Sequence, residues 1–326
     1  MSESVRPPRA HRLSRRSPRG RGRPGRGTAW AAGVLTGALL VTACGPDPAP
    51  TTASATAAGC ASSENDTAPA GSIPIAPAAV TLTDPGAEPR VAATAIPDRA
   101  AAQQVTLATI STEESAAAAT AQTVTLPLTA RFSCTDDAAV ALRLGTPTST
   151  DPALNAQLAA AGGTGTITRG PGLAPISLQL APPDAAAPAA RNAVEQSLVQ
   201  ALQTAIALPD APIGVGATWH AERTVSAAVT AVQTISARLT RRDGNRLTVT
   251  FTAEEEPVNS VFSVPGSTPL TITRYSYSGS GEVAVDLTRG LPVDGSLTYR
   301  GARELVGADA TTPLIQQIGF AATWTS

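Results

Sequence analysis

Few side chains in this 326-residue chain could carry out chemistry, and the most distinctive are its three cysteines, Cys44, Cys60 and Cys134. A cysteine can be acylated, can form a disulfide with a second cysteine, or can act as a nucleophile or metal ligand when its thiol is ionised. Which of these chemistries applies depends on the compartment in which the protein is located.

The segment before Cys44 has the layout of a secretory signal. The first 26 residues carry nine arginines and one acid, Glu3, and an apolar run follows from Ala31 to Ala43. That run is shorter than the roughly 20 residues of a membrane-spanning helix. A basic leader, a short apolar run and small residues at its end are typical of a cleaved signal peptide. We therefore expect export of the protein and removal of residues 1–43.

The four residues Val41-Thr42-Ala43-Cys44 resemble the lipobox of bacterial lipoproteins, in which an aliphatic residue and two small residues precede the cysteine. The resemblance implies diacylglycerol transfer to the Cys44 thiol and anchoring by acyl chains, such as palmitate, on the outer face of the cell membrane. The alternative is an ordinary secretory signal with an incidental Cys44. Export by either the Sec or the Tat route stays open.

Removal of the signal changes the charge of the protein. Residues 44–326 contain 15 arginines, no lysine and 24 acidic residues, a formal charge of −9. Nucleic-acid-binding proteins need a basic face, so this composition argues against a nucleic-acid partner.

Cys60 and Cys134 are left as an even pair if Cys44 is acylated. An exported protein is in an oxidising compartment where disulfides persist, so we predict a bridge between them. Two free thiols are the alternative.

Support for catalysis or metal binding is weak. After the signal the one histidine is His220, and alternation turns it to solvent if the preceding Trp219 faces the core. No second histidine accompanies it, and no Gly-x-Ser-x-Gly turn leads into a helix. We therefore expect no metal, no cofactor and no enzymatic activity, with a hydrolase that uses His220 as an alternative.

The acidic run Glu254–Glu256 is expected in a solvated loop. Tyr275 and Tyr277 share a strand face and could line a cavity, although stacking in the core is the default.

Two regions follow the signal. Residues 44–72 are rich in Ala, Thr, Ser and Pro and lack an apolar period, which predicts a flexible tether. Residues 73–326 are long enough for a single domain.

Alternation of apolar and polar residues predicts strands in that domain. In residues 124–134 the apolar side chains share one face with Cys134, and Pro127 on the other face indicates an edge strand or a bulge. The same alternation occurs at 140–144, 176–180, 235–239, 247–251, 283–287 and 318–324. Turn residues at 243–245 and 289–292 predict hairpins, so the sheet is expected to be mostly antiparallel.

Two helices are expected beside this sheet. Asp151-Pro152 predicts a capped short helix to about Ala160, and a longer amphipathic helix is expected over residues 187–207. One long and one short helix packed against an antiparallel sheet define an α+β fold.

Residues 208–219, with the sequence LPDAPIGVGATW, resemble a segment of an uncharacterised family of bacterial, largely actinobacterial, lipoproteins. Residues 285–292 also recur there, and the resemblance covers roughly residues 120–325. The layout is similar to the lipoprotein carriers of the LolA and LppX/LprG type. This similarity implies a curved, partly open, barrel-like sheet whose helices enclose an apolar cavity. The chain departs from those carriers in its long N-terminal portion and its few large apolar residues.

These features predict a membrane-anchored, non-enzymatic envelope lipoprotein that binds a ligand, for example a lipid or another apolar molecule. The alternative is a structural or adaptor domain that docks an envelope protein of unknown identity. Fold alone does not decide between them.

Overall fold

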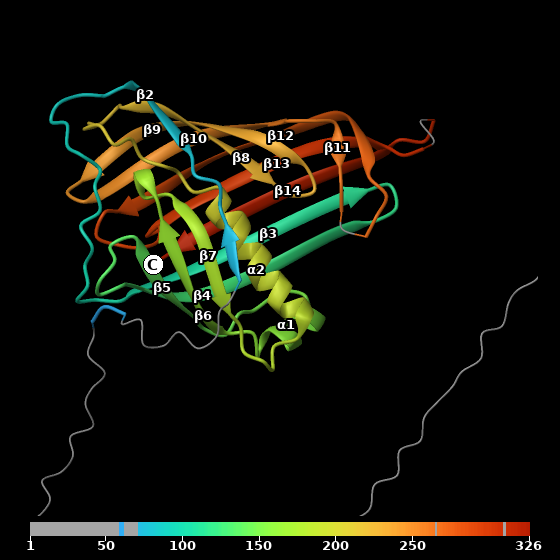
Figure 1. Ribbon diagram of the computed structural model, residues 1–326, viewed down its shortest axis with the longest axis horizontal. Coiled ribbons are helices and arrows are strands. Elements are labelled where there is room, and N and C mark those ends of the chain that lie inside the picture. Colours follow the sequence, from blue (N-terminus) through green and yellow to red (C-terminus); the bar gives the residue numbers. More distant parts are fainter. Residues whose placement is uncertain (1–58, 62–70, 265, 309–310) are drawn as a thin grey trace, which may run out of the picture. The chain divides into compact units, whose positions relative to one another are not determined.

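The structure, a computed structural model, describes residues 59–61, 71–264, 266–308 and 311–326. The expected signal, Cys44 and most of the expected tether lie outside these residues. The described residues form 14 strands and two α-helices (Figure 1). The strands are β1 (Ser72–Pro74), β2 (Ala79–Asp84), β3 (Gln103–Ser115), β4 (Ala119–Phe132), β5 (Ala139–Leu144), β6 (Gly163–Arg169), β7 (Pro175–Ala181), β8 (Thr218–Ser226), β9 (Thr230–Asp243), β10 (Arg246–Pro257), β11 (Val261–Phe262), β12 (Leu270–Asp286), β13 (Asp294–Val306) and β14 (Leu314–Thr325). The helices are α1 (Pro152–Leu158) and α2 (Pro188–Gln203).

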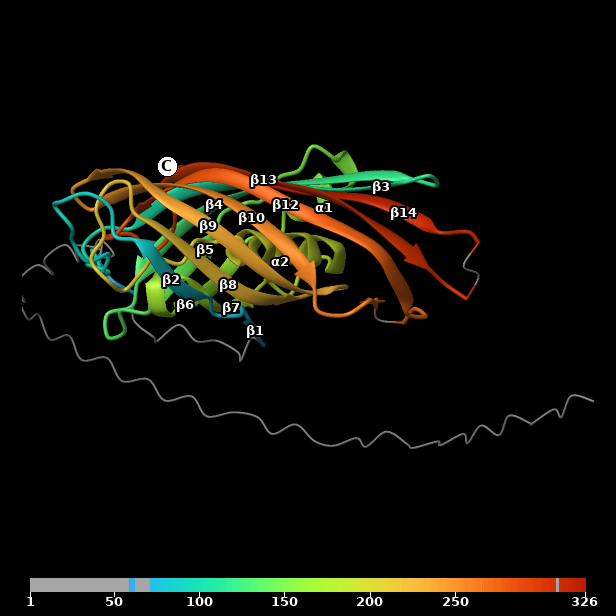
Figure 2. The ribbon, with the colours of Figure 1, turned by 90° about the horizontal axis from the view of Figure 1, so that it is seen from above.

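All the described strands belong to one sheet, in the order β1-β7-β6-β5-β4-β3-β14-β13-β12-β10-β9-β8-β2, with β11 paired to β12. Every pairing between these strands is antiparallel, as the hairpin turns predict. The sheet is curved and open, and it arches over α2 (Figure 2). The predicted α+β class is therefore confirmed.

The two edge strands, β1 and β2, are consecutive in the chain. β1 pairs with β7 at one edge of the sheet and β2 pairs with β8 at the other, so residues 75–78 connect the two edges. Ile75 in this connection is 2% exposed, and its backbone N–H donates to the carbonyl of Ile176 at 2.9 Å. The β1–β2 segment and the sheet thus enclose α2 between them (Figures 1 and 2).

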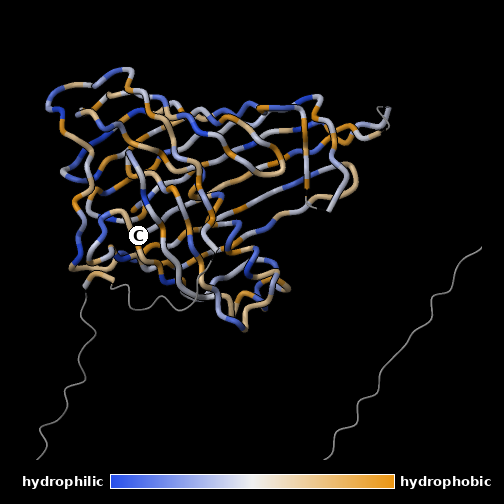
Figure 3. Tube along the Cα trace, viewed as in Figure 1, coloured by the Kyte–Doolittle hydropathy of each residue, from blue (hydrophilic) through white to orange (hydrophobic). Residues whose placement is uncertain are grey.

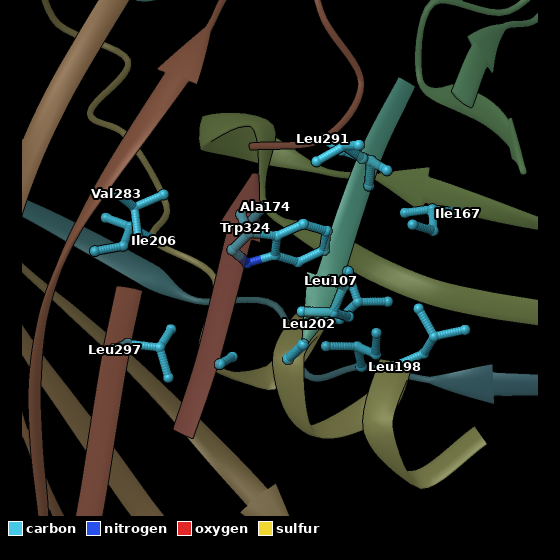
Figure 4. Close-up of a cluster of buried hydrophobic side chains, with 14 of the residues drawn as sticks. Leu107, Ile167, Ala174, Leu198, Leu202, Ile206, Val283, Leu291, Leu297 and Trp324 are labelled. Carbon is cyan, nitrogen blue, oxygen red and sulfur yellow. The ribbon is translucent and has the colours of Figure 1, made fainter. Parts of the chain in front are cut away.

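Alternation along the strands builds the core on the concave face. Apolar and polar residues alternate along the chain trace (Figure 3), and the apolar positions of β4 and β10 are buried. Leu198 and Leu202 of α2 lie beside Leu107 of β3 in a cluster that includes Trp324 of β14 (Figure 4). Burying each such side chain stabilises the fold by about 1.5–3 kcal/mol.

Helix α2 ends at Gln203, four residues before the predicted end at Ala207. The carbonyl of Ala205 accepts a hydrogen bond from the guanidinium of Arg223. The carbonyl of Ala207 accepts one from Nε1 of Trp219 at 2.8 Å. Side chains from strand β8 therefore satisfy carbonyls in the segment that follows the last turn.

The short helix follows its prediction more closely. Asp151 caps α1 by accepting a hydrogen bond from the backbone N–H of Ala153 at 2.9 Å, and Pro152 is the first helical residue. The helix ends at Leu158, which is fully buried.

Two expectations for the strand around residues 124–134 were wrong. Pro127 lies in an interior strand, because β4 pairs with both β3 and β5. It is tolerated there because β5 ends at Leu144, and Gly145 then donates its N–H to the Pro127 carbonyl at 2.8 Å. Cys134 is exposed and not on the core face, because β4 ends at Phe132.

Candidate functional site

A cavity of about 670 Å³ lies on the concave face of the sheet, next to the C-terminal half of α2. We call it the inner cavity. Tyr299 and Phe320 belong both to its wall and to the hydrophobic core. The cavity therefore lies directly next to the core, on the same concave face. Its volume lies within the roughly 300–1,000 Å³ typical of small-molecule sites.

Polar residues outnumber apolar ones in the wall. Helix α2 contributes Gln196, Gln200 and Gln203, and β4 contributes Gln122. All three tyrosines of the chain, Tyr275, Tyr277 and Tyr299, also line it. Amides and hydroxyls, which can donate and accept hydrogen bonds, therefore share the wall with apolar side chains.

Three adjacent strands place polar residues in one row on this face. Arg223 of β8 is the register partner of Gln233 of β9, and Gln233 is the partner of Glu255 of β10. Arg223 and Gln233 are only 3% and 2% exposed. Partners directly opposite across antiparallel strands point to the same face, so the three side chains are neighbours.

Glu255 is held by two hydrogen bonds. Nε2 of Gln233 donates to its Oε1 at 3.0 Å, and the hydroxyl of Tyr275 donates to its Oε2 at 3.0 Å. Burial nevertheless raises the pKa of Glu255, and the two hydrogen bonds partly offset this effect. The expectation of a solvated loop for Glu254–Glu256 was wrong, because the run lies within β10 and alternation turns its middle residue inward.

The tyrosines form the floor of the cavity. The rings of Tyr277 and Tyr299 stack with their centroids 5.6 Å apart and an interplanar angle of 27°. Gly279 leaves space for Tyr299, because a Cβ at this glycine would lie 2.6 Å from the Tyr299 ring. Burial raises the pKa of all three tyrosines, so their hydroxyls stay neutral. Stacking in the core was the default expectation for Tyr275 and Tyr277, and Tyr277 does stack on Tyr299. Both also line the cavity, which was the alternative.

Several buried polar atoms near the cavity have no hydrogen-bond partner among the described residues. They are Oε1 of Gln233, the hydroxyl of Tyr299, and Nε and Nη1 of Arg223. Arg223 itself is behind the wall, and burial lowers its pKa. An unpaired buried polar group costs about 1–3 kcal/mol, so these atoms favour an occupant that hydrogen-bonds to them.

Charged side chains also line the cavity, and Arg303 of β13 is the register partner of Tyr275. Nε of Arg303 donates to Oε1 of Gln316 at 2.7 Å, its Nη2 is 3.9 Å from Oε2 of Glu113, and its guanidinium carbon is 4.3 Å from the ring centroid of Phe262. Among the described wall residues, Arg303 is the one basic residue beside Glu113, Asp151 and Glu255.

The cysteines lie away from this cavity. Cys60 and Cys134 form a disulfide, as predicted, across a sequence separation of 74 residues. Backbone hydrogen bonds support it, from Ala61 N–H to the Phe132 carbonyl at 2.9 Å and from Cys134 N–H to the Ala61 carbonyl at 3.0 Å. Cys44 lies outside the described residues.

His220 also lies away from the cavity. It is exposed, as predicted, and its Nδ1 is 3.1 Å from the hydroxyl of Ser236, while Trp219 is buried on the opposite face. Within the part of the chain that the structure describes, no three His, Cys, Asp or Glu side chains gather as they would around a metal ion. The described helices include none long and apolar enough to span a membrane.

Four residues at or near the cavity were not predicted from the amino-acid sequence: Arg223, Gln233, Tyr299 and Arg303. A signal for Gln233 was present, because it occupies an inward position between Ala231 and Ile235 in an otherwise apolar face of β9. A polar residue at such a position is unusual and marks either a hydrogen-bond network or a site.

No protein-family model matches the chain, and no curated protein matches it. The resemblance to actinobacterial lipoproteins and to the LolA and LppX/LprG carriers therefore stays a prediction.

Proposed function

We propose that this chain is a membrane-anchored envelope lipoprotein, held on the outer face of the cell membrane by acyl chains on Cys44, that binds a ligand in the inner cavity without altering it chemically. The observation that carries the proposal is the inner cavity itself, which has the volume of a ligand site and polar groups that converge on it. The signal-like segment and the Val41–Cys44 lipobox support the location.

Ligand extraction tests the binding function. The full-length protein is purified from membranes in mild detergent, extracted with organic solvent, and the extract is analysed by mass spectrometry. We expect a reproducible small molecule that is lost in Gln203→Trp, which fills the cavity from α2, and kept in His220→Trp on the outer face. Absence of such a molecule, or equal retention in both variants, would contradict the proposal.

Fractionation tests the anchor. Cys44→Ala is expected to move the protein from the detergent-extracted membrane fraction to the soluble fraction. If the variant stays in the membrane fraction, Cys44 is not the anchor.

An adaptor role is the second candidate, and a separate observation favours it. Apolar side chains are exposed at the end of the sheet where β11 joins β12 and where β14 begins, namely Val258, Val261, Val264, Leu314 and Ile315. Clustered apolar side chains on a surface are typical of protein contacts. Val261→Asp with Ile315→Asp would then abolish crosslinking to one reproducible envelope partner and leave the extracted ligand unchanged.

A further inference from the structure

The hydrogen-bonding character of its wall bears on which ligands the inner cavity could accept. The residues that face it from α2 and β4 are mostly glutamines, and hydroxyls come from Ser111, Thr112 and Thr120. All of these groups are neutral, and each can donate as well as accept. A wall of this kind suits a ligand whose groups also donate and accept hydrogen bonds.

The buried polar atoms without a hydrogen-bond partner further restrict the chemical class of the ligand. Among the wall residues, Oε1 of Gln233 needs a donor, and the hydroxyl of Tyr299 can donate or accept. An anionic group only accepts, and it would meet three carboxylates in the wall against one basic side chain, Arg303. A cationic group only donates, so it would leave the N–H donors of the wall glutamines without an acceptor.

We propose that the inner cavity recognises a neutral, hydroxyl-rich group, such as a sugar or another polyol. This inference rests on the ligand-binding function proposed above and names the class of ligand. A hydroxyl donates and accepts at once, so it replaces the water that an empty polar cavity holds without leaving wall groups unpaired. Because Oε1 of Gln233 and the Tyr299 hydroxyl lie just beneath the wall, contact with them involves a side-chain adjustment of the kind common on binding.

The hydroxyl-rich group has two possible sources, a free sugar and the headgroup of a glycolipid. Probes that share one chain but differ in the headgroup test the class: octyl β-glucoside, octyltrimethylammonium and octyl phosphate, each below its critical micelle concentration. Methyl β-glucoside, which lacks the chain, separates the two sources. Calorimetric titration of the purified full-length protein, with any bound molecule first removed, measures each affinity.

We expect octyl β-glucoside to bind with one molecule per protein, and at least tenfold more tightly than either charged probe. Equal affinity of methyl and octyl glucosides indicates a free sugar, and loss of binding without the chain indicates a glycolipid headgroup. Either result supports the proposal.

Tyr299→Phe is the sharpest variant. It removes a hydroxyl that has no partner among the described residues, so a purely structural role for Tyr299 predicts no loss of stability or binding. Recognition by hydrogen bonding predicts an affinity for octyl β-glucoside about three- to tenfold weaker, with an unchanged unfolding transition. Gln203→Leu is expected to weaken binding in the same direction. Ser236→Ala, which removes a hydroxyl from the outer face, is the matched control and should leave binding unchanged.

Other outcomes overturn the inference in distinguishable ways. If the three octyl probes bind equally and Tyr299→Phe has no effect, the cavity binds through the chain, so ligand binding survives but hydroxyl recognition does not. Tighter binding of octyltrimethylammonium identifies a cation site instead. If no probe binds, hydroxyl recognition fails, and the extraction experiment decides separately whether ligand binding fails with it.

Discussion

Gln233 and Glu255 face each other across strands β9 and β10, and Nε2 of Gln233 donates a hydrogen bond to Oε1 of Glu255 at 3.0 Å. Gln233 is buried and Glu255 is partly buried on the concave face, where Tyr275 donates to the second oxygen of the same carboxylate. Two neutral donors stabilise the carboxylate less than burial destabilises it, which raises the pKa of Glu255. The consequence is a dependence of stability on pH.

Glu255→Gln is expected to remove that dependence. An acid whose pKa is raised on folding binds more protons in the folded than in the unfolded protein, so the free energy of unfolding falls as pH rises from the ordinary value of 4.5 through the raised pKa. The nearly isosteric amide does not ionise, so the stability of the variant relative to the natural protein should rise across this window.

Urea unfolding at a series of pH values from just below 4.5 upward measures the difference. Glu256→Gln, on the exposed face of the same strand, is the control and should not show this rise. A constant offset between Glu255→Gln and the natural protein at every pH would show that burial does not perturb Glu255.

Gly279→Ala is expected to lower the free energy of unfolding by about 1–3 kcal/mol, because the new Cβ would lie 2.6 Å from the ring of Tyr299. Displacement of that ring also disturbs its stacking on Tyr277. Chemical denaturation gives the size of the effect. Gly307→Ala is a suitable comparison, since its nearest neighbour would be Cδ2 of Leu270 at an ordinary 3.5 Å, and a change within about 0.5 kcal/mol is expected. Equal stability of the two variants would argue against the close packing of Tyr299 on Gly279.

Replacement of both Cys60 and Cys134 by serine is expected to lower the free energy of unfolding by about 4 kcal/mol. The reason is that a disulfide closing a loop of this length restricts the unfolded chain, and its removal restores that entropy. Denaturation with and without a reducing agent measures the effect. Reduced natural protein should unfold like the double variant, whereas a natural protein insensitive to reduction would mean that the bridge is absent.

Leu198→Ala is expected to cost about 2–5 kcal/mol, because this side chain of α2 is fully buried beneath the sheet. Glu195→Ala, on the exposed side of the same helix, should change stability little. A small effect of Leu198→Ala, comparable to that of the control, would show that α2 does not pack into the curve of the sheet.

Much of the fold could be predicted from local patterns. Alternation around residues 140–144, 235–239 and 247–251 located β5, β9 and β10, and Asp151-Pro152 located the start of α1. Strand β3 was not singled out, since Thr109 and Ser111 interrupt its apolar face in the half that reaches the cavity. The end of α2 was placed too late, because the side chains of Arg223 and Trp219, distant in sequence, bind carbonyls beyond its last turn.

The amino-acid sequence alone determined which face is apolar in the strands with clear alternation, where the helices begin, and which cysteines could pair, because these follow from the types and spacing of residues along the chain. Only the tertiary structure decided that Gln233, Glu255 and Tyr275 meet in one cavity beside α2. A period of two shows toward which face a side chain points, but the register between strands decides which residue is its neighbour. That register depends on pairing across the whole sheet. The candidate site therefore forms only in the folded protein, where the sheet curves around α2.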